Sequence, residues 1–376
     1  MRLKEYPEIM LDTIPKLYEI HSKVFITNLY GMEEQVERLP KRFCKMYTTQ
    51  PLANQLWIYL NRRNANISMQ DFHIVEESQP FAIRLSDGKR LEVMLCAGNE
   101  LGSSLMLLIR RQHGGRLLYY YSAVQQDDLS RLMGNETYQK WISLGTEVLF
   151  LNLQAANQPF VHIDFEGVAA EISKYCKDTG NEDVIKVPLF GYEYLVHRLA
   201  KTFTLFGHIE LQDSFMCNFC CLTLDTRYFH RPGYTCTVKI CNTNNFPGME
   251  HYPLSKLKWT PVPNRINLIQ LCSLLRPLHI SGIVGYHEMG NVGPVPAYLK
   301  RFKKGYSPKS HGIEIPETQL THEHSNDNAP AGYSNTQSEK ISPAKSPKDG
   351  TNSRRDPFVF TKPRKLAFVE YEDDRD

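Results

Sequence analysis

Alternation between apolar and polar positions predicts a hairpin-rich sheet in the first half of the chain. Short apolar runs at 24–27 and 148–151 are typical of buried strands. Between them, alternating runs come in pairs separated by Asp-Gly or Gly-Gly, which favour tight turns between antiparallel strands. The expected hairpins are 81–85 with 91–95 across Asp87-Gly88, and 105–109 with 117–121 across Gly114-Gly115.

Helical periodicity follows in the second half. Apolar residues recur at the spacing of one helix face in three segments, at 165–175, 194–203 and 266–275. Asn264 is a suitable N-cap for the last of these helices, and Pro277 cannot continue it. The short strands expected in this half are 222–224, 237–240 and a closing apolar strand at 281–286.

The composition changes sharply near residue 305. Between 310 and 356 large aliphatic side chains are few, and Ser, Pro, Asn and charged residues fill the segment. Such a segment cannot bury enough apolar surface to offset the entropy lost on ordering it. We therefore expect a disordered linker over 305–356, with Ser-Pro pairs at Ser307, Ser342 and Ser346.

The last segment, 357–376, differs from this linker. Its aromatic residues interleave with Lys and Arg, and it ends in acidic residues. Aromatic side chains on a flexible tether are typical of a docking segment that binds a partner groove or sheet edge. The alternative is a tail end that packs weakly on its own domain. The expected docking residues are Phe358, Phe360, Phe368 and Tyr371.

Composition and charge narrow the class of protein. Of the 376 residues 41% are hydrophobic and 23% charged, which excludes fibrous, coiled-coil and wholly disordered chains. The 44 basic and 41 acidic side chains give a net charge of +3, so any nucleic-acid footprint must be local. No segment has the apolar length of a signal peptide or of a membrane span, ~18 residues. We expect a nuclear or cytosolic protein that does not contact a membrane.

Nine cysteines are an odd number for a framework of paired disulfides, so reduced intracellular thiols are expected. One group has a spacing that loosely resembles a zinc ribbon. Because 222–224 and 237–240 have strand patterns, the favoured alternative is that these thiols are buried as small hydrophobes. The group consists of Cys217, Cys220, Cys221, Cys236 and Cys241.

Six segments occur in an informative order. The run Thr27-Asn28-Leu29-Tyr30-Gly31-Met32-Glu33 follows the first strand, and 95–103, centred on Asn99, follows the first hairpin. The others are 121–125, 151–154, 189–196 and 261–267. In this order and spacing the chain resembles the metallo-β-lactamase/β-CASP DNA nucleases of the cross-link-repair family (Artemis- and Apollo-like), over about residues 1–300.

The resemblance implies an α/β fold: a metallo-β-lactamase αββα sandwich with an inserted β-CASP-like α/β unit and a disordered C-terminal tail. It also implies that the closing strand at 281–286 pairs within the sheet that holds 24–27. The implied boundaries are 1–155 and 256–304 for the two parts of the metallo-β-lactamase-like domain, 156–255 for the β-CASP-like unit, 305–356 for the linker and 357–376 for the docking segment.

The residues at the family's metal-binding positions have changed. In the family the first run reads Thr-His-x-His-x-Asp-His, and such imidazoles and carboxylates hold zinc for phosphodiester hydrolysis. Here only Glu33 is a conventional ligand, Ala123 cannot bridge two metals, and Arg265 would place a cation where a metal binds. The substitutions predict no catalytic residue and no metal cofactor. The degenerate positions are Asn28, Tyr30, Met32, Glu33, Asn99, Ala123, Asn152 and Arg265.

Two functional classes follow. The first is a catalytically inactive relative of the DNA-repair and telomere 5′-exonucleases, acting as a protein-interaction or DNA-end-binding factor in genome maintenance. The alternative is a divergent metal-dependent 5′–3′ DNA exonuclease of interstrand cross-link or double-strand-break repair. The resemblance implies a nuclear protein whose partners are DNA-repair or chromosome-end proteins, bound through the C-terminal tail.

Weak DNA binding is a further expectation. The chain has local basic clusters at Arg62-Arg63, Arg110-Arg111 and 300–304. Such clusters contact phosphates in nucleic-acid-binding proteins. The alternative is solvated surface charge on a nearly neutral chain.

Overall fold

The computed structural model describes residues 1–35, 39–99, 101–111, 115–120, 134–142, 145–159, 163–179, 184–205, 207–222, 229, 237–242, 251–252, 259–283 and 294–305. They all belong to the first of two units, Met1–Pro308 and Lys309–Asp376. Several predictions lie outside the described residues. They are the linker after residue 305, the docking segment with Phe358, Phe360, Phe368 and Tyr371, the segment 121–125 with Ala123, Cys236, and the ends of the expected strands at 223–224 and 284–286.

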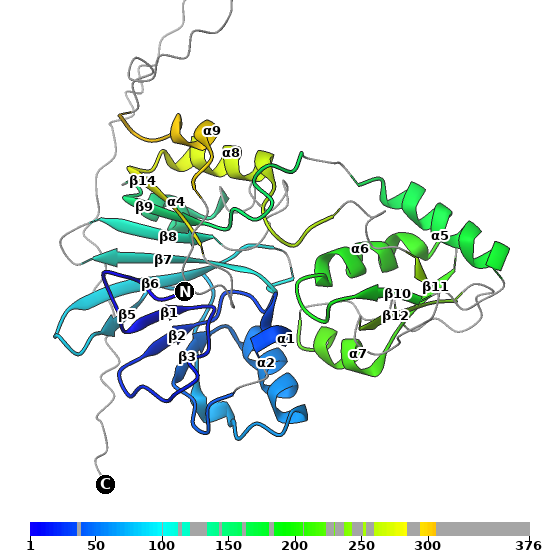
Figure 1. The fold of residues 1–376 in the computed structure, drawn as a ribbon, viewed down its shortest axis with the longest axis horizontal. Helices are drawn as coiled ribbons and strands as arrows, with labels where there is room; N and C mark the ends of the chain where they lie inside the picture. Colours follow the sequence, from blue (N-terminus) through cyan, green and yellow to red (C-terminus); the bar gives the residue numbers. More distant parts are fainter. Residues whose placement is uncertain are drawn as a thin grey trace, which may run out of the picture. The chain divides into compact units, whose positions relative to one another are not determined.

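The two predicted hairpins are confirmed and supply four adjacent strands, from the edge strand β5 to β8, of a six-stranded sheet ordered β14-β9-β8-β7-β6-β5 (Figure 1). Gly88, with φ +83°, occupies the turn between β5 and β6, a left-handed conformation that favours glycine. The hairpin strands pair antiparallel, whereas β8, β9 and β14 are parallel. The strands are β5 (Phe81–Arg84), β6 (Arg90–Ala97), β7 (Leu105–Arg111), β8 (Arg116–Tyr120), β9 (Val148–Leu151) and β14 (His279–Gly282).

A four-stranded parallel sheet, ordered β1-β2-β3-β4, precedes the hairpins. It meets the six-stranded sheet where the Leu105 N–H donates to the Thr27 carbonyl at 2.8 Å and where Asn28 bridges to Ser104. Its elements are β1 (Ile9–Leu11), β2 (Lys23–Phe25), α1 (Met32–Gln35), β3 (Lys45–Thr48), α2 (Gln50–Arg62), the short 3₁₀ helix η2 (Met69–Asp71) and β4 (Phe72–Ile74).

The six-stranded sheet lies between two hydrophobic cores. Leu107 and Tyr119 point to the core shared with the four-stranded sheet and α2, while their neighbours Leu108 and Tyr120 point to the opposite core. Because successive side chains of a strand alternate between faces, these apolar runs bury both faces of the sheet. The layers are helix, sheet, sheet, helix. The helices of the second core are α4 (Glu136–Ile142), α8 (Arg265–Leu275) and α9 (Ala297–Lys300) (Figure 1).

A second parallel sheet, ordered β11-β12-β10-β13, is formed by residues from the middle of the chain. The helices predicted over 165–175 and 194–203 are confirmed there as α5 and α6. The boundaries 156–255 stay a prediction. The elements are α5 (Phe165–Thr179), β10 (Val184–Val187), α6 (Glu193–Phe203), β11 (His208–Leu211), α7 (Asp213–Phe219), β12 (Thr237–Asn242) and β13 (His251–Tyr252).

The expectation that the closing strand pairs within the sheet of 24–27 is wrong. β14 pairs in parallel with β9 in the six-stranded sheet, with His279 opposite Val148 and Gly282 opposite Leu151. In the four-stranded sheet β2 lies between β1 and β3, and the outer strands are β1 and β4. β9 has β8 on one side only, and α8 returns the chain to its other edge.

The strand expected at 222–224 stays a prediction, because only Leu222 of it belongs to the described residues. Residues 213–219 form helix α7, and Leu222 lies in the bend that follows it. Phe215 and Phe219 are four positions apart and both buried, which is the spacing of one helix face. Cys217, Cys220 and Cys221 are therefore on and just after a helix. The strand expected over 237–240 is confirmed as β12.

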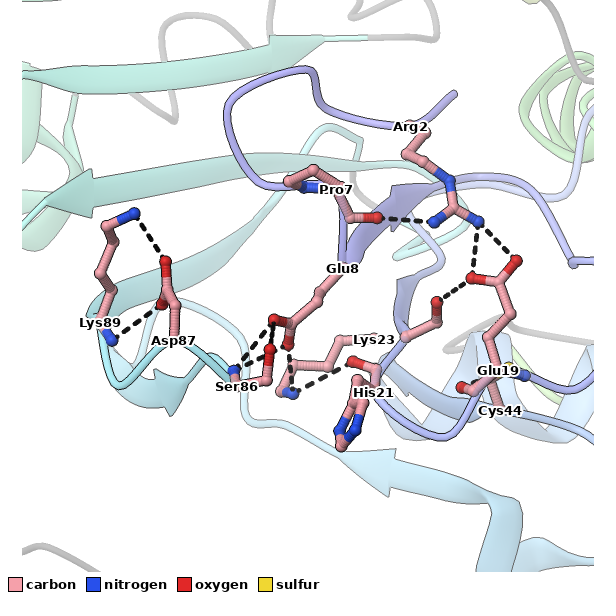
Figure 2. Close-up of polar contacts among 11 residues, drawn as sticks. Arg2, Pro7, Glu8, Glu19, His21, Lys23, Cys44, Ser86, Asp87 and Lys89 are labelled. Atoms are coloured by element: carbon pink, nitrogen blue, oxygen red, sulfur yellow. Dashed lines mark hydrogen bonds and ion pairs between the residues drawn. The ribbon is translucent and has the colours of Figure 1, made fainter.

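Polar contacts fasten the start of the chain to the first hairpin (Figure 2). The Glu8 carboxylate accepts from the backbone N–H of Ser86 in the β5–β6 turn, at 3.0 and 3.1 Å, and faces Lys23 Nζ at 3.5 Å. Arg2 Nη2 donates to both oxygens of Glu19 at 2.7 Å. These groups are partly exposed, so each contact contributes little stability, but together they hold β1 beside the turn.

The described residues thus form a mixed α/β fold with several sheets. Among them, no helix has the length and apolar character needed to cross a membrane.

Candidate functional site

A small cavity brings together three of the degenerate metal positions. Asn28, Tyr30 and Asn99 line it, together with Ser103 and Ser104 of the segment before β7. Its volume is about 20 Å³, room for a water molecule. The opposite wall comes from the start of α6, at Gly191, Glu193 and Tyr194, and from Trp259 and Pro261.

Asn28 is held by hydrogen bonds on both ends of its amide. It follows β2 and is 2% exposed. Its Nδ2 donates to Asp12 Oδ2 at 3.0 Å, and its Oδ1 accepts the N–H of Tyr30 at 3.0 Å. An asparagine oxygen that accepts the N–H two residues later forms an Asx turn, which fixes the local backbone.

The other two asparagines at degenerate positions form the same turn. Asn99 Oδ1 accepts the N–H of Leu101 at 3.2 Å, and also that of Ser103 at 3.1 Å. Asn152 Oδ1, after β9, accepts the N–H of Gln154 at 3.0 Å. Asn152 is buried but does not line the cavity. All three side-chain oxygens therefore bind backbone.

Asp12 contacts Asn28, which lines the cavity. The sequence had not indicated a role for Asp12. Its carboxylate accepts the Thr27 N–H and hydroxyl, each at 2.6 Å, and the Tyr119 hydroxyl at 2.9 Å. Burial raises the pKa of Asp12 to about 6, against these hydrogen bonds. The only sequence signal is a carboxylate directly after the apolar run of 9–11, and an aspartate after a strand is commonly a turn residue.

Two carboxylates fix the loop between β10 and α6. Glu33 Oε2 accepts the N–H of Leu189 at 3.0 Å, and Glu193 Oε2 accepts the N–H of Gly191 at 2.8 Å. Glu193 is 3% exposed. Burial raises the pKa of Glu193 to about 7, and the charge of nearby Glu33 acts in the same direction. The sequence signal for Glu193 was a glutamate in the first helical turn, which is ordinary for an exposed helix start.

Aromatic rings close the cavity on the α6 side. Tyr192 lies between Tyr30 and Trp259, with ring centroids 6.5 and 5.2 Å away. Gly191, with φ +92°, passes so close to Tyr30 that an added Cβ would lie 2.6 Å from Tyr30 Cδ2. Burial raises the pKa of Tyr192 to about 12, so its hydroxyl stays protonated at neutral pH. The wall is therefore neutral apart from the carboxyl of Glu193.

The remaining degenerate positions do not join the cavity. Met32 is fully buried in the hydrophobic core, and Arg265 is exposed with its guanidinium 4.8 Å from the ring centroid of Tyr298. Glu33 contacts the loop that carries the α6 wall without lining the cavity. Within the described ranges, no three His, Cys, Asp or Glu side chains are grouped so as to hold a metal ion.

Comparison with known proteins gives partial structural matches. No protein-family model matches the chain, and no curated protein does. Zinc-bound PqqB from Methylobacterium extorquens aligns with 34% of this chain and 44% of its own, at 17% identity and a TM-score of 0.21. An isothiocyanate hydrolase from Delia radicum gut bacteria aligns with 40% of this chain and 57% of its own, at 13% identity and a TM-score of 0.25.

Both similar structures are metallo-β-lactamase-fold proteins. The chain matches only about half the length of each, and TM-scores this low carry no argument about function. Neither match bears on the β-CASP unit or on DNA repair.

Proposed function

We propose that this chain is a catalytically inactive protein of the metallo-β-lactamase fold, with a β-CASP-like unit at 156–255, that serves as a protein-interaction or DNA-end-binding factor in genome maintenance. The observation that carries the proposal is the shared role of Asn28, Asn99 and Asn152. Each side-chain oxygen accepts the backbone N–H two residues later, at 3.0, 3.2 and 3.0 Å.

The donor set favours loop formation over zinc binding. Each of these amide oxygens already accepts a backbone N–H, so a metal would have to share an oxygen that holds its own loop. A neutral amide also offers zinc much less than an imidazole or a carboxylate does. The residues therefore fit zinc poorly.

Glu33, the one conventional ligand, has a comparable structural role. Its carboxylate accepts the Leu189 N–H and so holds the loop that leads into α6. This contact joins α1 to the segment before Gly191 and Glu193. It supports the proposal that the fold is retained as a scaffold. The residues at the matched active-site positions would then hold loops in place.

A nuclease assay tests the proposal. The purified full chain is incubated with single-stranded DNA and with 5′-ended duplex DNA, with and without chelator, and its metal content is measured. We expect no cleavage and no stoichiometric zinc. Glu33→Ala is the matched variant, because cleavage by a contaminating nuclease would be the same in both preparations. Chelator-sensitive cleavage that the Glu33→Ala variant lacks would establish the alternative, a divergent exonuclease.

DNA binding is the weaker part of the proposal, because the basic clusters have local partners. Arg110 forms an ion pair with Glu92, and Arg111 with Glu5 and Glu147. We expect weak duplex binding whose affinity falls steeply with salt, as phosphate contacts require. The measurement is a titration at several salt concentrations. Affinity independent of salt would rule out a phosphate footprint and leave protein interaction as the function.

The nuclear location and the partner class rest on the family resemblance. DNA-repair or chromosome-end proteins are the partners that it implies, bound through 357–376.

A further inference from the structure

The cluster at the end of α7 contains three thiols and one guanidinium. Cys217 is half-buried in the last turn, and Cys220 is exposed just after it. Arg62, at the end of α2, donates from Nη2 to Cys217 Sγ at 2.9 Å. Cys221 lies beside them and donates its thiol to the Cys217 carbonyl at 3.3 Å. Four reactive or charged groups thus meet where α2 and α7 pack together.

The three thiols are not equivalent. Burial raises the pKa of Cys221 to about 11, and the neighbouring thiols add to this effect, so Cys221 stays protonated. Cys217 is the thiol in contact with a cation. A guanidinium beside a sulfur stabilises the thiolate, which is the nucleophile in thiol chemistry. The C-terminal end of a helix does not favour an anion, so Arg62 is the group in contact with Cys217 that suits one.

The position of Cys220 suits it to act as the second thiol. Cys217 and Cys220 are three residues apart, and both have helical backbone conformation at the end of α7. Side chains three apart on a helix are neighbours, and the Cα separation of such a pair lies within the range that disulfides span. Their Cβ atoms must approach somewhat, which the terminal position of Cys220 permits.

We propose that Cys217 and Cys220 form a redox-active thiol pair, with Cys217 as the attacking thiolate, Arg62 as the cation that stabilises it and Cys220 as the resolving thiol. The co-reactant is a low-molecular-weight disulfide such as glutathione disulfide. Cys217 thiolate attacks one of its sulfurs, so a mixed disulfide forms and one glutathione leaves as thiolate. Cys220, after losing its proton to water, attacks Cys217 Sγ and displaces the second glutathione. Two protein thiols are oxidised and one small disulfide is reduced to two thiols.

The thiol pair is connected to the candidate site by hydrogen bonds, so its oxidation would affect that site. Asn218, next to Cys217, donates from Nδ2 to the Leu189 carbonyl at 3.1 Å and accepts at its own carbonyl from Gln55 Nε2 of α2 at 3.2 Å. Leu189 is the residue whose N–H binds Glu33. A disulfide at Cys217 removes its contact with Arg62 and distorts the turn that holds Asn218.

Other described cysteines serve as internal references. Cys96 and Cys272 are buried, and burial raises the pKa of each to about 12. Cys44 and Cys241 are buried as well. These thiols are expected to react slowly in the folded chain, so labelling at Cys217 can be read against them within one sample.

The first test measures alkylation of the reduced full chain by iodoacetamide at neutral pH, followed peptide by peptide by mass spectrometry. We expect Cys217 to react several-fold faster than Cys220. Arg62→Gln should slow Cys217 several-fold. Arg63→Gln is the matched control, because Arg63 lies over the Tyr59 ring at 5.1 Å and not on the sulfur; it should leave the rate unchanged. Equal rates in the wild type and Arg62→Gln would overturn the role of Arg62.

The second test treats the reduced chain with glutathione disulfide. The wild type should pass through a glutathione adduct at Cys217 and end as a Cys217–Cys220 disulfide. Cys220→Ser should stop at the adduct, and Cys217→Ser should give neither product. The proposal is wrong if Cys217→Ser takes up glutathione at Cys220 as fast as the wild type takes it up at Cys217, or if the wild type takes up no glutathione at Cys217. Circular dichroism of each variant separates lost reactivity from lost fold.

Discussion

At the scale of single residues, three asparagines of the matched segments fix their backbone in the same way. An Asx turn needs an oxygen that accepts a backbone N–H two residues later, and Asn28, Asn99 and Asn152 each supply one. Histidine, which the resemblance implies at the positions of Asn28 and Asn99, has no oxygen for this turn and would offer zinc a stronger donor. Under the proposed function, asparagine at these positions favours the loop over a metal site.

Gly191 tests how tightly the cavity wall is packed. Its φ of +92° strains any other residue, and an added Cβ would lie 2.6 Å from Tyr30 Cδ2. Gly88→Ala is the matched control, because Gly88 has φ +83° but no heavy atom within 4 Å of the added Cβ. We expect Gly191→Ala to lower the free energy of unfolding by about 1–3 kcal/mol more than Gly88→Ala does. Urea unfolding of both variants measures the difference, and equal losses would mean that Tyr30 moves freely.

Glu193 gives a pH dependence whose sign is fixed by its pKa. Burial raises that pKa from 4.5 to about 7, so between these pH values the folded chain holds a proton that the unfolded chain has released. The stabilisation from this proton is complete below pH 4.5 and is lost as the pH rises through about 7. Glu193→Gln removes it. Because one pKa unit corresponds to about 1.4 kcal/mol, the effect amounts to a few kcal/mol.

The measurement is urea unfolding of both proteins at pH 5 and pH 8. We expect the wild type to lose more stability between these values than Glu193→Gln does. Asp12, whose pKa is also raised by burial, to about 6, contributes a loss of the same sign to both proteins, so the comparison isolates Glu193. An equal loss in the two proteins would mean that Glu193 titrates near its ordinary pKa.

At the scale of elements, helix α8 is the clearest case of a segment determined locally. Asn264 Oδ1 accepts the N–H groups of Ile266 and Asn267 at 2.9 and 3.1 Å, and the Asn267 side chain returns a bond to the Asn264 N–H. The helix ends at Arg276, which has φ +41°, directly before Pro277. The reciprocal capping box explains why the sequence predicted the start of α8, and Pro277, which cannot continue a helix, explains why it predicted the end.

Removing the cap should weaken α8 and, with it, the attachment of β14. Asn264→Ala is expected to lower the free energy of unfolding by about 1 kcal/mol, because two N–H groups lose their acceptor. Asn264→Ser should cost much less, since serine also caps helices well. Thermal or urea unfolding of the two variants gives the comparison. Equal destabilisation by both would show that the amide has a role other than capping.

At the scale of the whole molecule, the proposed function is divided between the folded unit and the tail. The proposal places partner binding in 357–376, with Phe358, Phe360, Phe368 and Tyr371 as anchors. Deleting 357–376 is expected to leave the melting temperature of the folded unit unchanged. The reason is that a docking segment packs against its partner and not against the core of its own chain. The same deletion should abolish recovery of the main partner in a pull-down. If the partner is still recovered after the deletion, the folded unit makes the interaction instead of the tail.

The sequence pointed to part of the candidate site. The family resemblance implied a common site for Asn28, Tyr30 and Asn99, and these three line the cavity. It gave no indication that Asp12 lies beneath them or that Glu193 is buried. A carboxylate after a strand or at a helix start is usually solvated, and only neighbours from distant segments remove the water.

The sequence by itself determined the elements whose causes are short-range. Asp87-Gly88 between alternating runs sets a hairpin, and Asn264 with Pro277 bounds a helix, because turn and cap chemistry act over a few residues. The tertiary structure alone decided which edge β14 joins, and it joins β9 of the six-stranded sheet. It also decided that Cys217 lies on a helix beside Arg62, 155 residues away in sequence. Edge pairing and burial depend on which distant surfaces are left uncovered once the rest of the chain has packed, and no local pattern encodes that.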